Sequence, residues 1–236
     1  MLSGRRQKLA NIITDDFETG GFSATWNAGQ TTDGGNLSVA AAAKLHGNYG
    51  MSCLINDTHN MYTEYSGSDI PEVRFRFYID PNTISMPNGG LINLVANSNS
   101  GWSNNLYIQL EYYTASGYHI ALYAITDTGD KYYETVITDA PHCVEAHFKS
   151  ATGAGANNGI LKLWVDGALI GSDTAVDNDT KKFANCTFGA FGMSATTAGT
   201  FYMDDFVANN DGTYIGPIIS GVAIPVLMNQ YRMRRE

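Results

Sequence analysis

The sequence predicts an all-β fold, a two-sheet antiparallel β-sandwich of the jelly-roll type. Turn residues recur throughout the chain, with short alternating or apolar runs between them, and no long amphipathic helix is visible. The pair Asp166-Gly167 separates the alternating run 160–165 from the apolar run 168–170. This spacing predicts a β-hairpin with a two-residue turn, in which both turn residues have positive φ.

The first half of the chain supplies strands of two kinds. A short strand at 15–18 ends at the turn Thr19-Gly20-Gly21, and a Gly-rich stretch leads into the next. The clearest pattern lies at 72–80, where apolar residues alternate with Arg74, Arg76 and Tyr78, which predicts one core face and one polar face. The strands predicted in this half are 15–18, 37–42, 49–56, 61–66 and 72–80.

The second half continues as paired strands separated by Ser/Gly/Asn or Asp/Gly turns. The predicted strands are 91–97, 106–113, 118–125, 131–137, a strand that follows Pro141, the hairpin 160–165 and 168–170, and then 185–193 and 200–207. The motif Asp15-Asp16-Phe17 returns as Asp204-Asp205-Phe206, which predicts adjacent edge positions. Together the strands suffice for two stacked sheets.

Charge divides the chain into a body and two arms. The net charge is −9, but residues 1–13 carry +3 and residues 215–236 carry +2, which leaves −14 on residues 14–214. An acidic body repels phosphate backbones, so we expect no nucleic-acid binding. The predicted organisation is a basic arm at 1–13, a sandwich at 14–209 and an apolar and basic tail at 210–236.

Compartment signals are few. Cys53, Cys143 and Cys186 lack the spacing of a metal or redox motif, so we expect buried thiols without disulfides. The N-terminal residues lack the apolar core of a secretory signal. The apolar run 215–228 is interrupted by Pro217 and Pro225 and is too short to span a bilayer, so we expect no membrane insertion.

These elements, in this order, resemble the concanavalin A-like (laminin G-like) lectin and glucanase superfamily, over roughly Asp15 to Asn209. The superfamily includes lectins, hydrolases, lyases and structural modules, so the resemblance implies a fold and does not select a function. The segments that carry it are 15–20, 42–51, 144–149, 163–167 and 201–206.

Two catalytic readings of the resemblance were tested on the residues. The Glu-X-Asp-X-X-Glu pattern of its retaining hydrolases is absent, and the acids on the predicted strands stand singly, which favours a solvated sheet face. Alginate-lyase-like members use an Arg, a Gln, a His and a Tyr on one sheet. Arg74, Arg76, Gln109 and His119, with Tyr107, Tyr113 or Tyr123, offer these types, but the local motifs of the lyases are missing.

Two binding sites are predicted in their place. Related modules often pin the first strand to the last with calcium, for which Glu18, Asp204 and Asp205 are the candidate ligands. A carbohydrate platform is predicted where rings alternate with hydrogen-bonding side chains, because sugar C–H faces cover rings while hydroxyl groups find polar partners. Its candidate residues are Arg74, Arg76, Tyr107, Gln109, Glu111, Tyr113, His119 and Tyr123.

The leading hypothesis is a non-catalytic, lectin-like module, without enzyme activity, that binds glycans and is displayed on a larger assembly. The two arms would attach it to other subunits, so we expect an oligomeric context. Similar modules are frequent among decoration and adhesion proteins of phage virions, which assemble in the host cytoplasm. The alternatives are a polysaccharide lyase-like enzyme and a stand-alone, extracellular carbohydrate-binding module of a bacterium.

Overall fold

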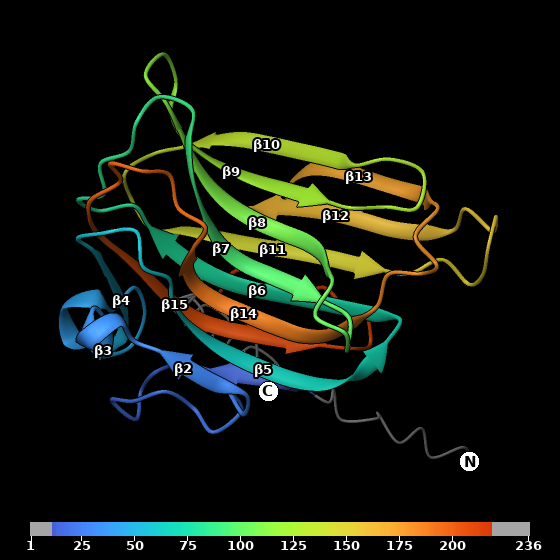
Figure 1. The fold of residues 1–236 in the computed structure, drawn as a ribbon. Coiled ribbons are helices and arrows are strands. Elements are labelled where there is room, and N and C mark those ends of the chain that lie inside the picture. The colour runs from blue at the N-terminus through green and yellow to red at the C-terminus, as the bar shows by residue number, and fades with distance from the viewer. Residues whose placement is uncertain (1–10, 219–236) are drawn as a thin grey trace, which may run out of the picture.

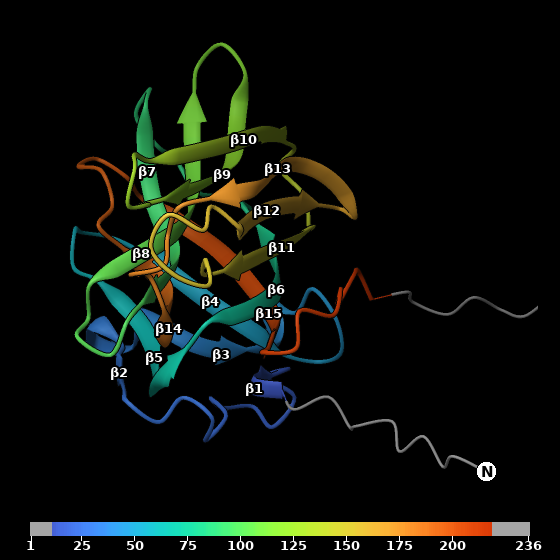
Figure 2. The same ribbon diagram turned by 90° about the vertical axis from the view of Figure 1, so that its right-hand side faces the viewer.

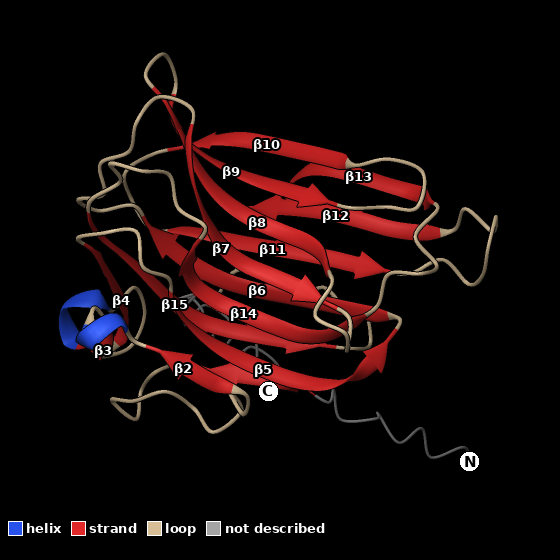
Figure 3. Cartoon of the chain, viewed as in Figure 1, coloured by secondary structure: helices blue, strands red, loops and turns tan. Residues whose placement is uncertain are grey.

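The computed structural model describes residues 11–218, which form two antiparallel β-sheets packed face to face, as predicted (Figure 1). Strands make up almost all of the regular structure, and the helical part is limited to two single turns, Asp33–Gly35 and Ala41–Ala43 (Figure 3). Figure 2 shows the layers from the side, with β7 and β8 on the left and β6 and β11 on the right. No helix within residues 11–218 is long and apolar enough to cross a membrane.

Sheet A has the strand order β13-β12-β11-β6-β15-β4-β3, with β1 also paired to β15. Its strands are β1 (Asn11–Asp15), β3 (Leu37–Ala40), β4 (Gly50–Ile55), β6 (Glu72–Asp80), β11 (His142–Lys149), β12 (Gly159–Val165), β13 (Ala168–Val176) and β15 (Gly199–Asn209).

Sheet B has the order β10-β9-β8-β7-β14-β5-β2. Its strands are β2 (Gly29–Thr31), β5 (Met61–Ile70), β7 (Gly90–Ser98), β8 (Asn104–Tyr113), β9 (Gly117–Ala124), β10 (Lys131–Ile137) and β14 (Phe183–Phe191). About half of the neighbouring strand pairs are not consecutive in sequence, so each face of the sandwich combines residues that no local pattern connects.

The core between the sheets is built from alternate residues of each strand. In β6 the residues Phe75 and Phe77 are fully buried, and both rings lie against Phe206 of β15. Phe188 of β14 reaches across from sheet B to within 4.6 Å of the Phe206 ring, measured between centroids. Burial of each such side chain stabilises the fold by about 1.5–3 kcal/mol, so this aromatic cluster is a main link between the sheets.

The hairpin predicted from Asp166-Gly167 is confirmed. The φ angles of Asp166 and Gly167 are 51° and 79°, and Val165 pairs with Ala168 across the turn. The Asp166 carboxylate also accepts a hydrogen bond of 2.8 Å from the backbone N–H of Cys143. The turn is therefore tied to the neighbouring strand as well as closed on itself.

The two copies of the Asp-Asp-Phe motif lie on adjacent strands, as predicted, but not at an edge of the sheet, because β15 lies between β6 and β4. Strand β1 pairs with β15, and Asp15 lies opposite Phe206. Strand β1 begins at Asn11, so residues 11–13, which we assigned to the basic arm, belong to sheet A. At Phe17 the chain turns with a φ of 57°, so the strand predicted at 15–18 ends earlier. Residues 1–10 of that arm lie outside the described residues.

The polar face predicted for β6 is buried, because the segment that follows β15 crosses it. Arg74 and Arg76 are only 6% and 4% exposed. The backbone N–H groups of Ile215 and Gly216 donate to the two carboxylate oxygens of Glu145, at 3.1 and 2.7 Å. This segment, drawn in red, lies on the sheet A side in Figure 2. The remainder of the predicted tail, 219–236, lies outside the described residues.

The three cysteines are buried and form no disulfide, as expected. Burial raises the pKa of all three thiols, in the case of Cys143 to about 11. A buried thiol with a raised pKa is a poor nucleophile. Cys53 and Cys186 belong to the core between the sheets, whereas Cys143 is buried beside Tyr78 on the outer side of sheet A.

Candidate functional site

The outer face of sheet B carries most of the predicted carbohydrate platform. Along β8, Leu106, Ile108 and Leu110 point into the core, so the residues between them point outward. The outward residues are Tyr107, Gln109, Glu111 and Tyr113 on β8, and His119 and Tyr123 on β9. Six of the eight predicted residues therefore share one face.

Cross-strand pairing places the tyrosines side by side. Tyr107 of β8 pairs with Tyr123 of β9, which pairs with Tyr132 of β10. The centroids of the Tyr107 and Tyr123 rings are 6.3 Å apart. Tyr132 was missing from the predicted set, although the alternation of β10 places it outward and leaves it 45% exposed. The three tyrosines form one cross-strand row over three strands, called here the tyrosine strip, in which the Tyr107 and Tyr123 rings are neighbours and the Tyr132 hydroxyl is directed to Glu111.

Amide side chains border this strip. Gln109 donates a hydrogen bond of 2.9 Å to the side-chain oxygen of Asn93 on β7. Both side chains are half-buried, so they are positioned by the sheet and by each other while still facing solvent. Such paired amides offer both donors and acceptors to a polar ligand.

The acids of this face do not stand singly, contrary to the prediction. The hydroxyl of Tyr132 lies 2.8 Å from a carboxylate oxygen of Glu111 and 3.0 Å from one of Glu134. Tyr113 donates to the same Glu111 oxygen at 2.9 Å. Burial and these two carboxylates raise the pKa of Tyr132 far above its ordinary value, so the phenol stays protonated and bridges the acids. The cluster stiffens the β8–β10 end of the face.

His119 lies beside this cluster, between a serine and an acid. Its Nε2 atom is 2.7 Å from the hydroxyl of Ser116, and its Nδ1 atom is 3.2 Å from a carboxylate oxygen of Glu134. The Nδ1 atom makes no hydrogen bond of acceptable geometry, so Glu134 does not orient the imidazole ring. In a catalytic triad the acid has to orient the histidine in this way. We assign His119 a structural place on the face.

Arg74 and Arg76 lie on sheet A, on the opposite side of the molecule, so they share no ligand with the sheet B residues. Arg74 pairs with Glu145 at 2.9 Å and its guanidinium lies 4.6 Å from the Trp164 ring centroid. Arg76 lies over Tyr78. We therefore remove both arginines from the candidate site. Sequence alternation shows which residues share a face of one strand, but it does not show which sheet the strand joins.

The outer face of sheet B carries no free Lys or Arg side chain on its described strands. The strands of sheet B contain one Lys and no Arg, and that residue, Lys131, is bound to Asp173 of β13 at 2.8 Å. The same face carries Glu64, Glu111 and Glu134. Its electrostatic character is therefore acidic.

A pocket of about 230 Å³ opens on the same face, at the end remote from β10. It lies between β5, β7 and β14 and the loop that joins β7 to β8. The prediction missed it, because its walls come from three distant parts of the sequence, 60–64, 96–104 and 187–191. Its lining residues are Asn60, Tyr62, Glu64, Ala96, Trp102, Asn104, Thr187 and Phe191.

The three predicted calcium ligands do not all lie together. Asp204 and Asp205 lie together with His46, and their potential ligand atoms are all within 4.8 Å of one another. Glu18 is engaged elsewhere, where it accepts hydrogen bonds from the backbone N–H groups of Asn48 and Tyr49 at 2.7 and 3.0 Å. The carboxylate of Asp204 is fully buried and accepts from the N–H groups of residues 45 and 46. Calcium prefers an all-oxygen shell, so the grouping with an imidazole fits it poorly, and calcium stays a prediction.

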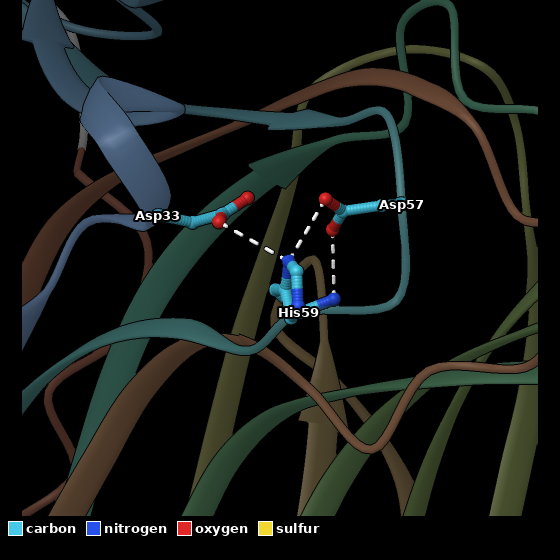
Figure 4. Close-up of side chains that lie close together, drawn as sticks. All are labelled: Asp33, Asp57 and His59. Carbon is cyan, nitrogen blue, oxygen red and sulfur yellow. Dashed lines mark hydrogen bonds and ion pairs between the residues drawn. The ribbon is translucent and has the colours of Figure 1, made fainter.

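Another group of potential ligands lies on the surface at Asp33, Asp57 and His59 (Figure 4). The Nδ1 atom of His59 is 2.9 Å from Asp57 and 3.5 Å from Asp33, and the His59 side chain is 75% exposed. The backbone N–H of His59 also donates to Asp57 at 2.8 Å. These contacts account for the geometry as a surface ion-pair group that closes the loop before β5.

No family model and no curated protein matches this sequence. Solved structures do share the fold. A variant of alginate lyase Aly36B in complex with alginate trisaccharide is 14% identical, with a TM-score of 0.54, over 84% of this chain and 97% of that one. Cellulose induced protein Cip1 is 17% identical, with a TM-score of 0.58, over 87% and 99%.

The binding domain of botulinum neurotoxin serotype G is 10% identical, with a TM-score of 0.58. The match covers 87% of this chain and 49% of that chain, so this protein spans about half of that domain. At such identities the likeness establishes the β-sandwich and no more.

Proposed function

We propose that this protein is a non-catalytic module that binds neutral glycans on the outer face of sheet B. The observation that carries the proposal is the tyrosine strip formed by Tyr107, Tyr123 and Tyr132, bordered by the amides of Asn93 and Gln109. Rings stack on the C–H faces of sugars, and fixed amides hydrogen-bond to hydroxyl groups. The fold shared with carbohydrate-related proteins is compatible with this role.

The charge of the face supports a neutral ligand. Uronate polymers carry one carboxylate on each sugar, and a binding face for them needs basic side chains. Here the described strands of sheet B offer no cation apart from Lys131, which is bound to Asp173. An anionic sugar would lie near the carboxylates of Glu64 and Glu134 and over the buried Glu111, so uronates are disfavoured.

The same observation argues against lyase chemistry on this face. A lyase neutralises the uronate carboxylate with a cation and moves a proton at the adjacent carbon. The two arginines predicted for that role are buried on sheet A, and Arg74 is paired with Glu145. Gln109 and His119 therefore lack the partner that the reaction requires.

The context we propose is display on a larger assembly, such as a phage virion assembled in the host cytoplasm. Both ends of the described chain lie with sheet A, since β1 pairs with β15 and the backbone N–H of Ile218 donates to the Tyr78 hydroxyl. This supports attachment of the module through its arms to other subunits, with sheet B turned away from them. Neither nucleic acid nor a membrane is part of the proposal.

A glycan array followed by calorimetry tests the binding function. We expect binding to neutral oligosaccharides and none to oligouronates, and weaker binding of the longer oligosaccharides in Tyr123→Ala and Gln109→Ala. Leu169→Ala is the matched control, because Leu169 is an exposed residue of β13 on the other sheet. Binding of uronates with formation of an unsaturated product would overturn the proposal in favour of a lyase.

The attachment is tested separately. Mass spectrometry and electron microscopy of the native source should find the protein in fixed stoichiometry with a particle. Deletion of residues 1–10 and 219–236 should abolish this association while leaving β1 and the contacts of 215–218 in place. A free protein in the native source, or unchanged association after the deletion, would refute attachment through the arms and leave glycan binding to be judged by the array.

A further inference from the structure

One cross-strand row connects the tyrosine strip to the pocket. Tyr107 of β8 pairs with Ala96 of β7, Ala96 pairs with Thr187 of β14, and Thr187 pairs with Glu64 of β5. The sheet B row is therefore Tyr132, Tyr123, Tyr107, Ala96, Thr187 and Glu64. Five steps between neighbouring strands span about 24 Å, which is long enough for several sugar residues.

Trp102 stands at the pocket end of this row. Its side chain is 48% exposed, and its backbone has a φ of 60°. A bulky residue rarely adopts this left-handed conformation, because it costs free energy that glycine would avoid. The surrounding turn holds it there, since the side-chain oxygen of Asn99 accepts from the N–H groups of Gly101 and Ser103 at 3.0 and 3.1 Å. Folding does not need an exposed indole at this position, so a role in binding is the better explanation.

The polar groups of the pocket suit hydroxyl groups. Among the described residues, the Glu64 carboxylate accepts one hydrogen bond, from the Thr187 hydroxyl at 3.5 Å, which leaves acceptor capacity toward the pocket. The side-chain oxygen of Asn60 accepts from the backbone N–H of Gly192 at 3.0 Å, so its NH₂ group remains to donate. Burial raises the pKa of Glu64, and hydrogen bonds donated by ligand hydroxyl groups would stabilise its charged form.

The pocket is small. Its volume of about 230 Å³ is below the range of about 300–1,000 Å³ that is usual for sites of drug-sized molecules. It therefore fits one sugar ring, while the remainder of a chain has to continue outside. The hydrogen bond of 2.6 Å from Asn104 to the Tyr107 hydroxyl joins the pocket wall to the tyrosine strip in that direction.

We propose that the pocket binds the end residue of a neutral oligosaccharide, with one pyranose ring against the Trp102 indole and its hydroxyl groups donating to Glu64. The following sugar residues lie along the sheet B row toward Tyr107, Tyr123 and Tyr132. This inference rests on the proposed function and adds to it the way the glycan is oriented. The pocket binds the end residue and supplies most of the affinity, and each further sugar residue along the row increases the affinity.

The end-residue subsite is tested by calorimetry with a series of neutral oligosaccharides, from disaccharide to hexasaccharide. The series is taken from the glycan class that binds in the array. Trp102→Gly should weaken binding of every member about tenfold or more. Tyr123→Ala should leave the disaccharide unaffected and abolish the gain in affinity with length. The melting temperature of Trp102→Gly should be unchanged or higher, because glycine adopts the φ of 60° without strain. Leu169→Ala on sheet A is again the control.

The outcomes separate this inference from the proposed function. Unchanged binding in Trp102→Gly together with loss in Tyr123→Ala overturns the end-residue subsite and leaves glycan binding on sheet B intact. Absence of binding to any neutral oligosaccharide overturns both. If Trp102→Gly lowers the melting temperature, Trp102→Phe is measured instead, because it keeps an aromatic ring. It should retain most of the disaccharide affinity. A loss of affinity as large as that in Trp102→Gly would refute stacking on the indole.

Discussion

Substitution of Glu145 by glutamine should cost more stability than almost any other isosteric change in the sandwich. Glu145 is 2% exposed, and its two carboxylate oxygens accept from Arg74 at 2.9 Å, from Ile215 N–H at 3.1 Å and from Gly216 N–H at 2.7 Å. In Glu145→Gln one of these oxygens becomes an NH₂ group, which cannot accept a hydrogen bond from a donor. At the same time Arg74 loses its counter-charge while it stays buried.

The magnitude follows from these two losses. Removing one partner of a buried ion pair typically costs about 3–5 kcal/mol, and a hydrogen bond to a charged group contributes about 1.5–3 kcal/mol. Arg74 keeps its contacts with His147 Nδ1 at 3.1 Å and with the rings of Trp164 and Tyr214. We therefore expect the low end, about 3 kcal/mol, which corresponds to a fall of about 6–12 °C in melting temperature for a domain of this size.

Urea unfolding followed by circular dichroism measures the free energy, and limited proteolysis reports whether the segment 213–218 leaves sheet A. The double variant Arg74→Met with Glu145→Gln is the control, because removal of both charges should recover part of the loss. A loss below about 1 kcal/mol, or a double variant that is as unstable as the sum of the single ones, would show that the buried pair does not hold the segment.

Three further predictions concern the loops and ends of the sandwich. Burial raises the pKa of Asp204 from 3.8 to about 6, so the carboxyl stabilises the fold when protonated; this contribution is complete below about pH 4 and is lost as pH rises through 6. In EDTA, the stability of the wild type relative to Asp204→Asn should therefore rise between pH 7 and pH 5, and a difference that is flat with pH would contradict this. If calcium occupies the predicted site, millimolar calcium at pH 7 should raise the melting temperature of the wild type and not that of Asp204→Asn; equal shifts in both proteins would exclude Asp204 as a ligand. Gly167→Ala should lose about 1 kcal/mol in urea unfolding, because the φ of 79° is strained for alanine, and an unchanged midpoint would contradict this.

Much of the fold could be predicted because alternation is a local property. The bounds of β6 and β10 agree with the predicted ranges 72–80 and 131–137. Strand β2 was missed, because Gly29-Gln30-Thr31 is fully exposed and has no apolar residue to create a pattern. Strand β13 was expected to end at 170 but extends to Val176, since its Gly171, Ser172 and Asp173 are typical of turns. They form a strand here because tertiary pairing with β12 overrides their local preference.

The site was less predictable, because it depends on which strands become neighbours. The alternating residues of β8 and β9 were identified, since these strands are joined by a short hairpin. The pocket was not, because Glu64, Ala96 and Thr187 come together only through pairings between β5, β7 and β14. One local signal existed: Trp102 is a large aromatic residue within an Asn-Ser-Gly-Trp-Ser turn, where folding alone favours small residues.

Both ends of the described segment 11–218 lie on sheet A, which has a consequence for how strongly the protein would hold a surface. A module anchored from that side presents sheet B outward, and many copies fixed on one support would all face the same way. Two linked sites engage a polyvalent target with a combined affinity that can exceed either single affinity by about 10²–10⁴, provided that their spacing allows both to bind at once. Weak binding by each copy would then add up to firm but reversible adhesion. The affinity of one isolated module for a glycan therefore underestimates the adhesion of the whole assembly.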